Sequence, residues 1–115
     1  MDEFAQSLQQ TGFQGDIDTA AETLETYSHD ASMFEIRPQV VVSPKDATDV
    51  ERVVKLVAER KSQQPDLSIT ARSAGTDMSG GAINDSIIMD FKKYFTAIHE
   101  ITPEAAHAQP GVFYR

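Results

Sequence analysis

The sequence has 115 residues and contains no cysteine. This absence excludes disulfide bonds, thiolate catalysis and zinc sites built on cysteine. The length suits one modest domain. Because 40% of the residues are hydrophobic and 24% are charged, the composition is ordinary for a folded globular chain.

Basic residues are few. Ten lysines and arginines stand against 18 aspartates and glutamates, which gives a formal net charge of −8. Nucleic acids and anionic membrane surfaces bind to basic faces, so we expect neither as a partner. A small phosphate ligand is compatible with this charge, because backbone N–H groups hold phosphate without net positive charge.

Long apolar runs are missing as well, and no stretch approaches the length of a membrane span. The first ten residues, MDEFAQSLQQ, are acidic and polar, unlike a secretory signal. We therefore expect a cytoplasmic protein without a membrane span.

Residues 1–37 are predicted to form a helical and irregular N-terminal arm. Hydrophobic residues recur at helical spacing as far as about Glu25, and Gly12 and Gly15 separate two helical pieces. The hydrophobic positions are Phe4, Leu8, Ile17, Ala20, Ala21 and Leu24. Pro38 then disfavours helix at the residue before it.

Residues 38–95 are predicted to form a small parallel βαβ subdomain. A β-branched run at Val40–Ser43, ended by Pro44, predicts a buried strand. A helix is expected over Ala47–Lys61, with Asp46 as its N-cap. Its predicted apolar stripe consists of Val50, Val53, Val54 and Val57. Two more strands are expected at Ser68–Ala71 and Ile87–Asp90, and strand, helix, strand makes the first two strands parallel.

Residues 96–115 are predicted to begin an antiparallel subdomain, with a hairpin around Thr102, Pro103 and Glu104. The fold class is therefore α+β with an α/β start. Because a second sheet only begins here, we expect the chain to be the front part of a larger protein.

The stretch RSAGTDMSGGA, residues 72–82, follows a predicted strand at its carboxyl end. Ligands of open α/β sheets bind at that edge. The stretch has neither the Gly-Lys-Ser/Thr of a P-loop nor the GxGxxG fingerprint, and it leads into a strand, so no helix dipole is available. A phosphate would have to lie in a nest of N–H groups, which glycines permit by taking positive φ. The alternative is a plain glycine-rich turn.

This stretch resembles the pyrophosphate loop of the flavin domain shared by vanillyl-alcohol oxidase and para-cresol methylhydroxylase, and more closely the glycolate oxidase and D-lactate dehydrogenase branch. Further blocks match that branch in the same order. They are YSHDAS, PQVVVSPKDATDVERVVKLV, SIIMDFKKYFTAIHEI and AHAQPGV. The resemblance implies an FAD-binding domain.

The resemblance also implies which residues contact FAD. Loop residues that match the pyrophosphate contacts are Arg72, Ser73, Ala74, Gly75, Thr76, Asp77, Ser79, Gly80 and Gly81. Pro44 matches the adenine end, and Pro110 and Gly111 match the flavin side. Some relatives carry a flavin-linked histidine where this chain has Thr76, so the resemblance implies non-covalent FAD.

Several polar residues, inside and outside the loop, have structural roles as alternatives to functional ones. His29, His99 and His107 follow no metal-binding spacing, so we expect no metal site and a packing role for His29. Arg72 could meet a phosphate or could cap its strand beside an acidic neighbour, and the sequence leaves both open. Asp77 is expected to brace the loop.

Two functions are compatible with the sequence. The first is the FAD-binding N-terminal portion of a flavin-dependent oxidoreductase that oxidises a 2-hydroxy acid such as D-lactate or glycolate. The remainder of that enzyme would be its partner, and the substrate-binding and catalytic groups would lie there. The second is a non-catalytic α/β module that self-associates or binds a protein through an open sheet edge.

Overall fold

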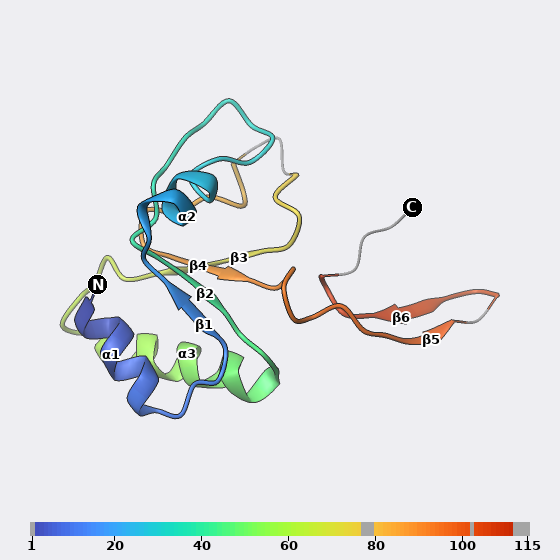
Figure 1. Ribbon diagram of the computed structural model, residues 1–115, viewed down its shortest axis with the longest axis horizontal. Helices are drawn as coiled ribbons and strands as arrows, with labels where there is room; N and C mark the ends of the chain where they lie inside the picture. Colours follow the sequence, from blue (N-terminus) through green and yellow to red (C-terminus); the bar gives the residue numbers. More distant parts are fainter. Residues whose placement is uncertain (1, 77–79, 102, 112–115) are drawn as a thin grey trace.

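The protein, described from a computed structural model, has a central mixed sheet with helices on both faces (Figure 1). The structure describes residues 2–76, 80–101 and 103–111. The sheet has the strand order β1-β2-β4-β3. Its strands are β1 (Asp16–Asp18), β2 (Val40–Ser43), β3 (Ile69–Arg72) and β4 (Ile87–Asp90).

Strand pairing in the parallel part of the sheet agrees with the predicted fold class. β4 pairs parallel with β2 on one side and with β3 on the other. The two strands joined by the long helix are thus parallel, as predicted, but β4 lies between them. β3 begins and ends one residue later than the strand predicted at Ser68–Ala71, so that Arg72 belongs to it.

The N-terminal arm is more integrated than its sequence suggested. Helix α1 (Asp2–Gln10) and helix α2 (Ala21–Thr26) form, but Asp16–Asp18 is a strand that pairs antiparallel with β2. The helical prediction for these residues was wrong, because pairing with a buried strand outweighs local spacing. Gly15 makes this pairing possible, since a Cβ there would overlap the carbonyl of Ser43.

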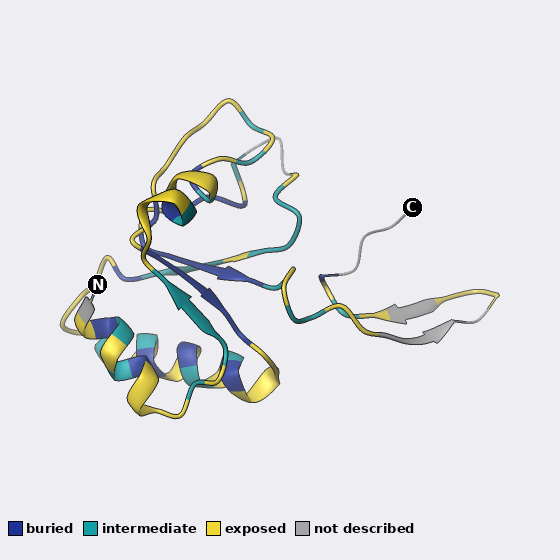
Figure 2. Cartoon of the chain, viewed as in Figure 1, coloured by how far each residue is buried: buried dark blue, intermediate teal, exposed yellow. Residues whose placement is uncertain are grey.

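Two hydrophobic clusters cover the two faces of the sheet (Figures 1 and 2). On one face, α1 and α3 (Ala47–Arg60) pack against β2 and β4. The buried residues of this cluster are Phe4, Leu8, Val40, Val42, Val53, Leu56, Leu67, Ile87 and Met89. On the other face, Leu24 of α2 packs on Val41 and Ile88.

Helix α3 begins as predicted and carries a buried carboxylate in its first turn. The Asp46 side chain accepts from the backbone N–H of Asp49 at 2.9 Å. Asp49 is itself fully buried and accepts from the N–H groups of Gln14 and Lys45 and from the Arg52 guanidinium. Burial alone would raise the pKa of Asp49, but these hydrogen bonds outweigh it and lower that pKa. Asp49 thereby ties the start of α3 to the chain before β1.

The hairpin prediction is confirmed by β5 (Ile98–Ile101) and β6 (Ala106–Ala108), which pair antiparallel. The β5–β6 hairpin extends away from the central sheet (Figure 1). Thr102, at the predicted turn, lies outside the described residues. Among the described helices, none has the length and apolarity needed to cross a bilayer.

The prediction that Val54 belongs to the buried stripe of α3 was wrong. Val54 has half of its surface exposed (50%), whereas Val53 is fully buried and Leu56 occupies the core position instead. We expect Val53→Asp to unfold the protein, because an unpaired buried carboxylate destabilises by several kcal/mol, a large part of a small domain's stability.

Val54→Asp is the matched control, one residue away with the same change in charge and shape. It should melt within a few degrees of the parent in a thermal scan followed by circular dichroism. Equal loss of stability in both variants would contradict the placement of α3.

Candidate cofactor-binding site

The carboxyl ends of the three parallel strands meet at one edge of the sheet. β3 and β4 end at Arg72 and Asp90, which are register partners. β2 ends at Ser43 and is followed by Pro44, whose side chain is fully buried. The fold thus brings the predicted residue Pro44 and the start of the glycine-rich loop to the same edge, where ligands of such sheets bind.

The loop has the backbone conformation that its glycines were expected to provide. Gly75 has φ +70° and Gly80 has φ +84°, and no described residue other than glycine has positive φ, so Ala74 keeps an ordinary backbone. In the described part of the chain, the N–H groups of Ala74, Gly75 and Thr76 donate to no protein acceptor. Three consecutive donors without partners fit an anionic ligand such as a diphosphate.

Arg72 holds this loop from inside. Its Nη1 donates to the carbonyl of His29 at 2.6 Å and more weakly to that of Ala82 at 3.4 Å. Its Cζ lies 4.9 Å from the centre of the Tyr27 ring, within cation–π range. The guanidinium also occupies the space that a Cβ of Gly75 would need. Nη1 of Arg72 is therefore used by protein carbonyls, and the charge of the guanidinium lies beside the loop backbone.

Tyr27 supports Arg72 and is fixed in turn by the sheet. Its hydroxyl donates to Asp90 Oδ2 at 2.6 Å, and Asp90 is buried at the end of β4. Burial, together with this hydrogen bond to a carboxylate, raises the pKa of Tyr27 above its usual value. The hydroxyl thus stays protonated and remains a donor.

Asp30 and Phe34 contact the far end of the loop. Asp30 accepts from the N–H of Ser32 at 2.9 Å and weakly from that of Ala82 at 3.4 Å. Hydrogen bonds from Ser32 and Ala82, with the charge of Arg72, lower the pKa of Asp30 despite its slight desolvation. The Phe34 ring lies 3.2 Å from where a Cβ of Gly80 would stand. Residues 27–34 therefore form the outer support of the loop.

The Pro-Gly pair near the end of the chain meets the loop from the other side. The Ser73 hydroxyl donates to the carbonyl of Pro110 at 2.5 Å. Gly111 is buried, and its N–H donates to the carbonyl of Phe95 at 2.6 Å. A Cβ at Gly111 would overlap the carbonyl oxygens of Phe91 and Phe95, so this close approach requires glycine.

The side chains of the remaining predicted residues take no part in the contacts described above. Thr76 and Gly81 are exposed, and Asp77 and Ser79 lie outside the described residues. A pocket of about 370 Å³ lies at the opposite edge, at the amino ends of β2, β3 and β4, where Gln39, Leu67 and Ser86 line it. It is therefore separate from the loop.

Sequence reasoning missed the supporting residues. Tyr27, Asp30 and Ser32 were recognised only as part of a matching block, without a role. Asp90 was noted only as the end of a strand. Neither the partners of Arg72 nor those of Tyr27 follow from spacing, because the bond from Tyr27 to Asp90 spans 63 positions.

Comparison with known proteins identifies the class of this fold. A family described as the FAD binding domain matches residues 38–115. D-2-hydroxyglutarate dehydrogenase of Escherichia coli (strain K12) is 37% identical over 101 residues, which is 88% of this chain and 10% of that protein. The enzyme of the same name from Pseudomonas putida is 35% identical over 102 residues, which is 89% of this chain and 10% of that protein.

Solved structures share the fold. The structure of p-cresol methylhydroxylase with substrate bound matches 96% of this chain and 22% of that chain, with a TM-score of 0.73 and 23% identity. The structure of an alkyldihydroxyacetonephosphate synthase matches 90% of this chain and 21% of that chain, with a TM-score of 0.70 and 16% identity.

The chain belongs to the FAD-binding domain family, and FAD is its cofactor. The predicted resemblance and fold class are confirmed. The chain spans about a tenth of the length of the curated relatives that it matches.

The support from Tyr27 can be tested by removing one oxygen. Tyr27→Phe should lower the free energy of unfolding by about 1–3 kcal/mol, because it leaves the buried Asp90 carboxylate short of a donor. Chemical denaturation measures this difference.

Tyr94→Phe is the matched control, because the Tyr94 hydroxyl donates to Asp16, a far more exposed carboxylate. It should change stability much less than Tyr27→Phe. If both variants lose the same free energy of unfolding, the hydrogen bond from Tyr27 to the buried Asp90 does not stabilise the fold more than an exposed one.

Proposed function

We propose that this chain is the FAD-binding N-terminal portion of a flavin-dependent oxidoreductase that oxidises a 2-hydroxy acid. The observation that carries the proposal is the loop with two positive-φ glycines at the carboxyl edge of the parallel strands. The names of the curated relatives favour D-2-hydroxyglutarate among the 2-hydroxy acids. D-lactate and glycolate, which the sequence predicted, are the alternative substrates.

In this proposal the loop binds the pyrophosphate of FAD through its backbone. The N–H groups of Ala74, Gly75 and Thr76 donate to the phosphate oxygens, since they have no acceptor in the described chain. The residues Ser73, Asp77, Ser79, Gly80 and Gly81 flank them. Gly75 and Gly80 let the backbone approach closely. The charge of Arg72 lies beside these donors and favours an anion there.

The two ends of the cofactor are assigned by the same proposal. Pro44 lies near the adenine, and Pro110 and Gly111 lie near the flavin ring. The bond from Ser73 to Pro110 supports this arrangement, because it joins the phosphate loop to the flavin side. Thr76 offers no side chain that links covalently to the flavin, so FAD is held non-covalently.

Bound FAD would supply a hydride acceptor for the hydroxyl-bearing carbon of the substrate; the hydroxyl proton would go to a base, and the product would be a 2-oxo acid. We assign no catalytic residue to this chain. The base and the groups that bind the substrate would belong to the remainder of the enzyme. The cytoplasmic location and self-association of the chain stay predictions.

Gly75→Val should abolish FAD binding by the 115-residue chain. The side chain would meet the Arg72 guanidinium and cannot adopt the positive φ without strain, so the three donors lose their arrangement. Quenching of flavin fluorescence during titration measures the Kd. By contrast, Thr76→Ala should raise the Kd by no more than about tenfold, the effect of one hydrogen bond.

Gly12→Val controls for strain alone, because Gly12 also has positive φ but contacts Arg52 of α3. This variant should keep the parent's affinity for FAD. If Gly75→Val folds and binds FAD as tightly as the parent, the pyrophosphate does not lie on this loop.

The chain by itself should turn over no substrate. We expect dye reduction with D-2-hydroxyglutarate, D-lactate or glycolate in excess FAD to equal that of free FAD, because transition-state binding needs the groups assigned to the remainder of the enzyme. Turnover clearly above free FAD would place the active site within these 115 residues and overturn that assignment.

A further inference from the structure

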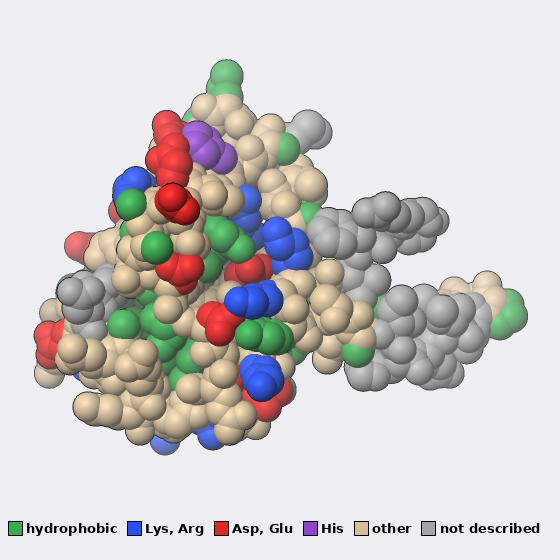
Figure 3. All heavy atoms as spheres, in the orientation of Figure 1, with side chains coloured by type: hydrophobic (Ala, Val, Ile, Leu, Met, Phe, Trp, Pro, Cys, Tyr) green, Lys and Arg blue, Asp and Glu red, His purple; other side chains and the backbone are tan. Residues whose placement is uncertain are grey.

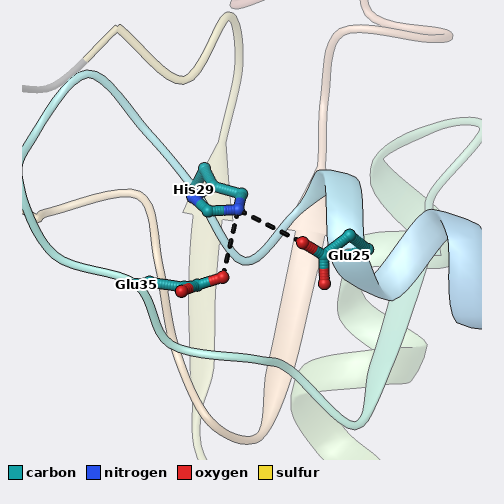
Figure 4. Close-up of side chains that lie close together, drawn as sticks. All are labelled: Glu25, His29 and Glu35. Atoms are coloured by element: carbon teal, nitrogen blue, oxygen red, sulfur yellow. Dashed lines mark hydrogen bonds and ion pairs between the residues drawn. The ribbon is translucent and has the colours of Figure 1, made fainter.

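A cluster of three potential metal ligands lies at the surface beside the outer support of the loop (Figure 4). Glu25 comes from α2, and His29 and Glu35 come from the chain that follows it. His29 and Glu35 face each other in an isolated antiparallel bridge. Spacing along the sequence gave no sign of this group, because Glu35 reaches it only through the fold.

One ring nitrogen of His29 faces both carboxylates. His29 Nε2 lies 3.5 Å from Glu25 Oε1 and 3.2 Å from Glu35 Oε1, and all three donor atoms lie within 4.8 Å of one another. A tetrahedral zinc ion with bonds of about 2.0–2.1 Å places its ligand atoms roughly 3.3–3.4 Å apart. The two distances from His29 therefore match two edges of a zinc coordination shell.

The two carboxylates of the cluster carry more negative charge than the neighbouring Arg37 neutralises. Arg37 pairs with the other oxygen of Glu25, Oε2, at 3.6 Å, which leaves Oε1 directed toward His29. Two carboxylates thus share one imidazole, on a chain whose net charge is −8. Figure 3 shows acidic side chains beside a histidine side chain on this face of the molecule, with basic side chains nearby.

From this geometry we propose that Glu25, His29 and Glu35 form a binding site for a zinc ion. An imidazole nitrogen with two carboxylate oxygens is a donor set that suits zinc, and water completes its coordination. The proposal departs from the expectation, based on spacing, that the histidines serve no metal. It does not depend on FAD or on the proposed reaction.

Zinc at this site would stiffen the support of the glycine-rich loop. The carbonyl of His29 accepts from Arg72, and Phe34 contacts the Gly80 position. Joining Glu25 to Glu35 through a metal closes the chain segment that carries both contacts. Zinc should therefore raise the melting temperature of the protein, by roughly 10 °C at about one hundred times its Kd.

The test is a zinc titration of the 115-residue chain followed by calorimetry and by the imidazole signals in NMR spectra. His99→Gln with His107→Gln removes the other two histidines, so that every imidazole signal comes from His29. We expect one zinc per chain, a shift of the His29 signals, and the rise in melting temperature. His29→Gln and Glu35→Gln should each weaken zinc binding at least about tenfold.

Glu22→Gln is the matched control, since Glu22 is another exposed acid of α2 outside the cluster. It should bind zinc like the parent. Zinc binding that survives His29→Gln, or magnesium that binds as tightly as zinc, would mean diffuse attraction to acidic surface and would overturn the proposal. His29 signals that do not respond to zinc would overturn it as well.

Discussion

The position of the Arg72 guanidinium is the constraint on which the loop geometry depends. It lies at the end of β3, stacks on the Tyr27 ring, donates to two backbone carbonyls and fills the space beside Gly75. These contacts join the sheet, the N-terminal segment and both ends of the loop. Nη1 of Arg72 donates to both carbonyls, and the N–H groups of Ala74, Gly75 and Thr76 have no acceptor in the described part of the chain. An acidic protein can thus present a local anion site without a basic surface.

The hydrophobic core holds in place the strands at whose ends these residues lie. Val40, Val42, Ile87 and Met89 are buried against α1 and α3, which fixes β2 and β4 side by side. Tyr27 is then anchored on Asp90, at the end of β4, and the loop begins at the neighbouring end of β3. The support of the loop is therefore built from segments that lie far apart in the sequence and become neighbours only through sheet pairing.

Local patterns predicted what local interactions determine. Asp46 capping α3, the strands at Val40–Ser43 and Ile87–Asp90, and positive φ at Gly75 and Gly80 all follow from residues close in sequence. Errors arose where tertiary contacts decide. Asp16–Asp18 is strand because β2 lies beside it, and Leu56 replaces Val54 because the sheet lies on that side of α3. The partners of Arg72 and Ser73 were likewise invisible without the fold.

Amide chemical shifts in a ¹⁵N-labelled chain test the central claim most directly, namely that the loop backbone holds the pyrophosphate of FAD. FAD and ADP should each shift the amide signals of Ala74, Gly75 and Thr76, since both ligands carry a diphosphate. Riboflavin and adenosine, which lack phosphate, should leave these signals in place. If FAD binds while the three amides stay unshifted, the diphosphate lies elsewhere and the account is wrong.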